Sequence, residues 1–174
     1  IGNYAFQDCS NLETVTFSNS LETIGYSAFS GCSKIKELNL PSSLKTINDY
    51  AFQNLSLITE LVVPDSVTSI GHGAFKGMSS LVEITLPFVG TSANTDSYYN
   101  SVFGYIFGEG SSSDAGTTTQ HYNSSYDYYF IPKTLRTVTI TQDTTIPYGA
   151  FYNCSFLTEI NIPDTVTSIG QKAF

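Results

Sequence analysis

The sequence repeats itself with a fixed period, and this period limits the possible folds more than any other feature. An Ala-Phe dipeptide marks most units. The step from Phe6 to Phe29 recurs from Phe29 to Phe52 and to Phe75, and again from Phe151 to Phe174. A unit of this length cannot bury its apolar side chains alone, whereas stacked units can, because each turn covers its neighbours. The period therefore predicts a solenoid of stacked turns.

Each unit contains a segment in which apolar and polar residues alternate, as in a strand with one buried face. The two alternating apolar columns are Val15, Leu38, Leu61, Ile84 and Ile160, and Phe17, Leu40, Val63, Leu86 and Ile162. A proline follows in most units and ends the strand, because it has no N–H for pairing. Connections between parallel strands are almost always right-handed. We therefore predict a β-rich, right-handed solenoid with a parallel sheet on one face.

The rest of the unit predicts smaller elements. A second apolar pair, such as Val67 with Ile70, predicts a short second strand. The Ala-Phe segment lacks a β-branched run, which favours a short helical turn. Gly25, Gly71 and Gly170 occupy one column, where we expect a bend that needs a positive φ angle.

The register fails between Pro87 and Leu135. The step from Phe75 to Phe151 equals three units plus seven residues. We therefore divide the chain into regular repeats over 1–90, a degenerate repeat or insertion rich in Tyr, Ser and Thr over 91–134, and regular repeats over 135–174. Within the middle part, 91–101 and 109–125 have the composition of loops, and 102–108 is apolar.

Seven of the 12 tyrosines fall in this middle part, and they allow two interpretations. They could cover a gap in the core, or they could form an exposed patch for a ligand, because tyrosine has an apolar body and a polar tip. The candidate ligand contacts are Tyr98, Tyr99, Tyr126 and Tyr128. The pattern at 131–140 matches two parts of the repeat, and we favour a main strand at 135–140.

The motif I-G-x-x-A-F-x-x-C-x-x-L-x-x-I-x-L-P, as in the unit that starts at Ile24, resembles the BspA-type leucine-rich repeat family. The resemblance covers about residues 1–90 and 135–174. It implies an α/β solenoid of the leucine-rich-repeat type that is secreted or displayed on the cell surface. It also implies adhesion, with extracellular or host proteins as partners. Because the sequence starts and stops inside a unit, we expect 1–174 to be one solenoid within a longer array.

The outward side of the predicted main strands is the first candidate site. Glu37, Glu60 and Glu83 form one outward column, and Asn39 and Thr85 belong to the next. A row of carboxylates can recruit a basic partner or bind Ca²⁺ weakly. The same row can equally be a solvated face that keeps the protein soluble. A structural spacer and a glycan-binding platform built by the tyrosines are the alternative functions.

The composition excludes other classes. The chain carries 15 acidic and 7 basic side chains, for a net charge of -8, which argues against nucleic acid. No apolar run approaches the ~18 residues of a membrane span. Neither His72 nor His121 has an evident orienting group, so we expect no catalytic site and no cofactor. Three cysteines share a column with Leu55 and Met78, which predicts buried thiols and no metal site: Cys9, Cys32 and Cys154.

Overall fold

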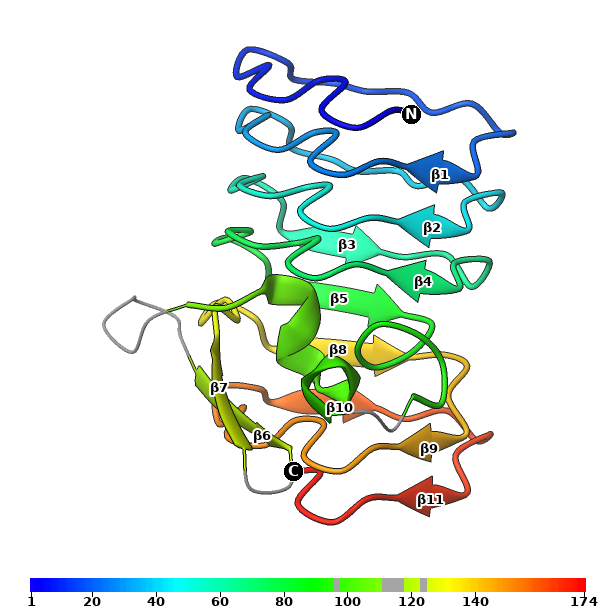
Figure 1. Cartoon of the computed structure of the whole chain (residues 1–174), viewed down its shortest axis with the longest axis vertical. Helices are drawn as coiled ribbons and strands as arrows, with labels where there is room; N and C mark the ends of the chain where they lie inside the picture. The colour runs from blue at the N-terminus through cyan, green and yellow to red at the C-terminus, as the bar shows by residue number, and fades with distance from the viewer. Residues whose placement is uncertain (96–97, 111–117, 123–124) are drawn as a thin grey trace.

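The structure is a computed structural model that describes the backbone of residues 1–95, 98–110, 118–122 and 125–174. The chain coils into a stack of turns that runs from the N-terminus at one end to the C-terminus at the other (Figure 1). Strands on two faces of the stack build separate parallel sheets, as the repeat predicts. A short antiparallel hairpin and two 3-10 helices interrupt the middle of the stack.

The main sheet contains four parallel strands in the order β10-β8-β5-β3. Their bounds are Glu60–Val62 for β3, Glu83–Leu86 for β5, Thr137–Ile140 for β8 and Glu159–Asn161 for β10. Leu61, Ile84 and Val138 stand side by side in the register, and all three are buried. The predicted parallel sheet is confirmed, and β8 places the main strand of this turn within 135–140.

The second face carries the short strands that the second apolar pair predicts. They are β1 Thr23–Ile24, β2 Thr46–Ile47 and β4 Ser69–Ile70 in one sheet, and β9 Thr145–Ile146 and β11 Ser168–Ile169 in another. Between β4 and β9, residues of the middle segment take the place of a short strand on this face. There the backbone N–H of Ile70 donates to the carbonyl oxygen of Thr91 at 2.9 Å. This face is therefore interrupted where the main sheet is continuous.

The segment around each Ala-Phe consists of consecutive tight turns, where we expected a short helical turn. Most of the phenylalanines donate their backbone N–H to the next turn of the stack, as from Phe29 to the oxygen of Ala51 at 2.8 Å and from Phe52 to that of Ala74 at 2.9 Å. These bonds replace the bonds that a helix would make within the segment. The residue before each Ala has a positive φ angle, 55° at Tyr50 for example, which also prevents a helix.

The glycines of the bend column have a different role from the one we expected. Gly25, Gly71 and Gly170 do not have positive φ angles. They are required by close approach between turns, because a Cβ atom at Gly71 would lie 2.3 Å from the backbone nitrogen of Asp49. A side chain there would push two turns apart.

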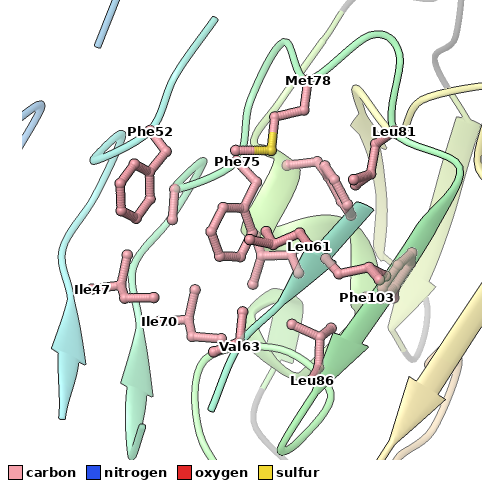
Figure 2. Packing of buried hydrophobic residues seen from close by; sticks show 14 of the residues in the cluster. Ile47, Phe52, Leu61, Val63, Ile70, Phe75, Met78, Leu81, Leu86 and Phe103 are labelled. Carbon is pink, nitrogen blue, oxygen red and sulfur yellow. The ribbon is translucent and has the colours of Figure 1, made fainter. Parts of the chain in front are cut away.

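The core runs through the stack as columns of like residues (Figure 2). Phe29, Phe52 and Phe75 are fully buried and stack nearly parallel, with ring centroids 5.7 and 6.3 Å apart. Leu61 of the main sheet lies beside Phe75, as Figure 2 shows. Each ring is therefore covered by the turns above and below it, which is why one unit cannot fold alone.

The middle segment is one greatly lengthened turn. Glu60 of β3 pairs with Glu83 of β5, one unit later in the sequence, whereas Glu83 pairs with Thr137 of β8, more than two units later. The spacing of three units and seven residues between Phe75 and Phe151 therefore does not represent three turns. Two 3-10 helices, η1 Tyr98–Ser101 and η2 Phe103–Phe107, stand in the lengthened turn.

The helix η2 carries the hydrogen-bond ladder of the stack through the lengthened turn. Phe75 donates its backbone N–H to the oxygen of Ile106, and Phe103 donates its own to that of Ala150, both at 2.9 Å. Ile106 and Phe103 are fully buried. The apolar segment predicted at 102–108 is thus a substitute for one Ala-Phe turn, and its buried side chains cover the core there.

The loop composition of 109–125 concealed a hairpin. It consists of β6 Thr118–Tyr122 and β7 Ser125–Tyr129, which pair antiparallel. No helix among the described residues is long and apolar enough to cross a membrane.

Candidate functional site

The outward face of the main sheet brings the predicted acidic residues together in part. Glu60 of β3 and Glu83 of β5 are direct neighbours in the register, and both are exposed. The next strand places Thr137 beside Glu83 and separates it from Glu159. Like charges opposite one another on adjacent strands repel, so this pair lowers the stability of the sheet slightly.

The second outward column contains an apolar residue beside the polar residues that we predicted as contacts. Thr85 is half-buried and stands between Val62 of β3 and Thr139 of β8. Val62 is 51% exposed, which makes it one of the most exposed apolar side chains described. The face thus has an apolar centre beside a row of carboxylates, and sequence reasoning did not single out this valine as a contact.

Glu37 and Asn39 lie opposite this row, across a groove. Both residues are exposed. The structure describes this stretch completely, and no backbone hydrogen bond joins the segment 36–40 to β3. The groove between them has a volume of about 450 Å³ and is lined by Lys36, Glu37 and Glu60, among others. The edge of β3 that faces the groove therefore has free backbone groups.

The predicted tyrosine patch is described in part. Tyr128 of β7 is 46% exposed, whereas its neighbour Tyr129 is buried. A Cβ atom at Gly104 would meet the ring of Tyr129 at 2.4 Å, so this ring packs against the backbone of η2. The side chains of Tyr98, Tyr99 and Tyr126 lie outside the described residues, as does that of His121. Tyr129 therefore belongs to the core, whereas Tyr128 faces solvent.

Gln120 of β6 anchors the hairpin, and nothing in the sequence indicated this role. Its side chain is fully buried. The amide oxygen accepts the backbone N–H of Gly104, and the amide nitrogen donates to the oxygens of Ala150 at 3.1 Å and Tyr152 at 3.3 Å. The same nitrogen lies 3.3 Å from the sulfur of Cys154. One side chain thus joins the hairpin, η2 and the next regular turn.

Asp143 plays a similar part on the second face. Its side chain is 1% exposed, and its two oxygens accept the backbone N–H groups of Val89 at 2.8 Å and Asn94 at 3.0 Å. Burial raises the pKa of this carboxyl, while the two hydrogen bonds oppose the rise. Asp143 therefore fastens the start of the lengthened turn to the turn that follows it.

The cysteines follow the prediction with one exception. Cys32 and Cys154 are buried free thiols, and burial raises the pKa of both. Cys9 is a free thiol too, but it is exposed, because it belongs to the first turn of the stack, which only one neighbouring turn covers. Among the described residues no group of three or more His, Cys, Asp or Glu could hold a metal ion.

The ring of His72 is held between two aromatic side chains. The residue is half-buried, and its ring lies between those of Tyr50 and Tyr105 at centroid distances of 5.5 and 5.3 Å. Its Nδ1 atom is 3.0 Å from the hydroxyl of Tyr50. The ring therefore has a fixed position within a row of aromatic side chains.

Comparison with known proteins agrees with this geometry. The model of the BspA type leucine rich repeat region matches six copies, over residues 1–118 and 101–174. The chain belongs to this family. The BspA-type repeat thus extends into the lengthened turn, where the regular spacing is lost. No curated protein matches the chain at a significant level.

Solved structures of bacterial leucine-rich repeat proteins share the fold of this BspA-type chain. The T. pallidum leucine-rich repeat protein TpLRR is 25% identical with a TM-score of 0.59, and the match covers 98% of this chain and 65% of that one. A leucine-rich repeat protein from Eubacterium ventriosum is 17% identical with a TM-score of 0.56, covering 90% and 41%. The pneumococcal vaccine antigen PcpA is 24% identical with a TM-score of 0.53, covering 98% and 34%. The chain thus spans less than two thirds of each of these proteins.

Proposed function

We propose that this chain is a non-enzymatic binding module of a secreted or surface-displayed protein, and that its main-sheet face contacts extracellular or host proteins rich in basic side chains. The BspA-type repeat family is typical of surface proteins, which supports a location outside the cell. The repeat is a scaffold that presents one extended surface, which is how solenoids bind their partners.

One observation carries the proposal: Glu60 and Glu83 form an exposed pair beside the exposed Val62. Protein interfaces combine an apolar centre with a polar rim, and complementary charge guides the encounter. The net charge of -8 adds a long-range attraction for a basic partner.

The groove beside β3 supports the same proposal. A strand edge with free N–H and C=O groups is a template for an extended segment of another chain. The groove offers such an edge together with Glu37 and Glu60, whose carboxylates would pair with Lys or Arg of the bound segment. Asn39 and Thr85 lie on the same face and complete the proposed contact surface.

The test is a binding screen of the intact chain against extracellular matrix and host-surface proteins. The double variant E60K/E83K reverses the charge of the proposed site. The matched control E22K/D164K makes the same change of charge at two exposed acids that do not line the groove beside β3. We expect the affinity of each partner to fall at least tenfold for E60K/E83K and to stay unchanged for E22K/D164K. Binding to the wild type should weaken as the salt concentration rises. Equal affinity of both variants for every partner found would refute the site.

A second candidate is glycan binding by the hairpin, because Tyr128 is exposed there. Its test is the variant Tyr128→Ala against a glycan array. A structural spacer is the third possibility, and it predicts that no specific partner is found in either screen.

A further inference from the structure

A row of aromatic rings crosses successive turns of the stack, next to the Ala-Phe dipeptides. Neighbouring centroids lie 5.2 to 5.8 Å apart, and each ring meets the next edge-on. The members are Tyr4, Tyr26, Tyr50, His72 and Tyr105. One ring comes from each turn, so the row follows the long axis of the stack seen in Figure 1.

A second, polar row runs beside it. Gln7, Ser30, Gln53 and Lys76 occupy one column of the repeat, because each follows the phenylalanine of an Ala-Phe dipeptide. With Tyr4, Tyr26, Tyr50 and Ser27 they line an open groove of about 470 Å³. The hydroxyl of Ser30 donates to the amide oxygen of Gln53 at 3.3 Å, which orients that amide. Each turn thus offers an aromatic ring on one side of the groove and a hydrogen-bonding group on the other.

The backbone shows that these rings are placed at a cost. Tyr4 and Tyr50 have φ angles of 59° and 55°, a region that is unfavourable for a residue with a large side chain. The equivalent positions of two other turns are Gly73 and Gly149, which adopt φ angles of 61° and 64° without that cost. Ser27 and Lys172 hold the same position in two further turns, with φ angles of 49° and 58°. The positive φ angle therefore belongs to the repeat, and glycine would satisfy the fold at positions 4 and 50.

We propose that this groove binds a neutral, extended polysaccharide that lies along the stack. The exposed parts of the Tyr4, Tyr26 and Tyr50 rings would contact the C–H surfaces of successive sugar rings. The amides of Gln7 and Gln53 would exchange hydrogen bonds with the sugar hydroxyls. Because one ring comes from each turn, an extended polysaccharide would meet the same kind of contact at successive sugar units.

The chemistry of the lining favours this ligand over the alternatives. Among the described residues that line the groove, Lys76 is the single charged one, and its ammonium donates to the carbonyl oxygen of Glu109 at 2.8 Å. A polyanion would meet this one cation and a chain with a net charge of -8. A proline-rich peptide also packs on aromatic rings. It offers carbonyl acceptors but few donors, so it could bond to the amide N–H groups of this row only, whereas a sugar hydroxyl both donates and accepts.

The test uses the emission of the tyrosines, which is directly visible because the chain has no tryptophan. The intact chain is titrated with cellohexaose, maltohexaose, xylohexaose, a sulfated heparin hexasaccharide and a decaproline peptide, and calorimetry measures the affinities. The test variant Tyr50→Gly keeps a residue that accepts the local φ angle. The control Lys172→Gly makes the same kind of change at an exposed residue with φ of 58°. Gln53→Ala tests the polar row, and Tyr128→Ala tests the hairpin.

We expect saturable binding of at least one neutral hexasaccharide, weakened tenfold or more by Tyr50→Gly and Gln53→Ala and unchanged by Lys172→Gly and Tyr128→Ala. Circular dichroism of each variant shows that the fold is retained; if Tyr50→Gly unfolds, Tyr4→Gly replaces it. The proposal is overturned if no neutral sugar binds at millimolar concentration, if heparin or decaproline binds instead, or if Tyr128→Ala alone removes binding. The main-sheet variant E60K/E83K should bind the sugar normally, so the two proposals fail independently.

Discussion

The anchoring of the hairpin by Gln120 allows a stability prediction. Gln120→Leu keeps the volume of the side chain but removes its hydrogen bonds. The N–H of Gly104 loses its acceptor, and the oxygens of Ala150 and Tyr152 lose a donor. Gly104 and Ala150 are buried, so water cannot replace these bonds. The oxygen of Ala150 still accepts the N–H of Phe103, so the N–H of Gly104 is the buried group that loses its partner. A buried polar group without a partner costs about 1–3 kcal/mol, and we predict a loss of this size in the free energy of unfolding.

The assay is urea denaturation followed by circular dichroism and tyrosine emission. The control is Gln142→Leu, because Gln142 is exposed, and its effect should stay within about 0.5 kcal/mol. Hydrogen exchange adds a local measurement, since the amide proton of Gly104 should exchange much faster in Gln120→Leu. A loss below about 1 kcal/mol, with Gly104 still protected, would show that the amide network does not hold the hairpin on the stack.

Three further predictions concern single positions. Gly71→Ala forces a Cβ atom against the backbone of the neighbouring turn and should cost about 3 kcal/mol in urea denaturation, whereas Gly2→Ala has nothing within 4 Å and should be neutral. Burial raises the pKa of Asp143 above its ordinary value of 3.8, so between these two pKa values this carboxyl takes up a proton on folding. Its contribution to the free energy of unfolding should therefore fall as pH rises from that value through the raised pKa, and Asp143→Asn should remove this slope; a difference between the two proteins that does not vary with pH would contradict the reasoning. Cys32 and Cys154 are buried free thiols, so a thiol reagent should modify them only after unfolding; rapid modification of either in the folded chain would show that the turns open readily.

The repeat made the regular turns predictable, because the same column is buried in every regular unit within the stack. Leu61, Ile84 and Val138 could be assigned to the core from spacing alone, and the structure buries all three. Spacing reports whether a position is covered, and it does not report which partner covers it. The bend column shows this limit, since a positive φ angle and a close approach both select glycine, and at Gly71 the close approach is the reason.

The lengthened turn was predictable only in outline. Its contacts occur once, so no second copy in the sequence reveals them. Gln120 and Asp143 are polar residues in polar surroundings, and nothing near them in the sequence indicates that their side chains are buried. The aromatic row was overlooked for another reason. Its members alternate between two adjacent columns, as Tyr4, Tyr26 and Tyr50 do, so neither column looks aromatic throughout.

The way in which the stack accommodates the lengthened turn has a consequence for how such proteins can vary. β5 and β8 pair directly although the chain between Glu83 and Thr137 is more than twice as long as a regular turn, so the extra chain adds nothing to the height of the main sheet. It extends sideways (Figure 1), from a buried base formed by η2 and Gln120. The number of stacked turns and the size of a lateral insertion can thus vary independently in this architecture. A new appendage could replace the hairpin without altering the surface that the strands present, provided that it supplies one apolar segment for the core and one buried amide for the backbone groups of its neighbours.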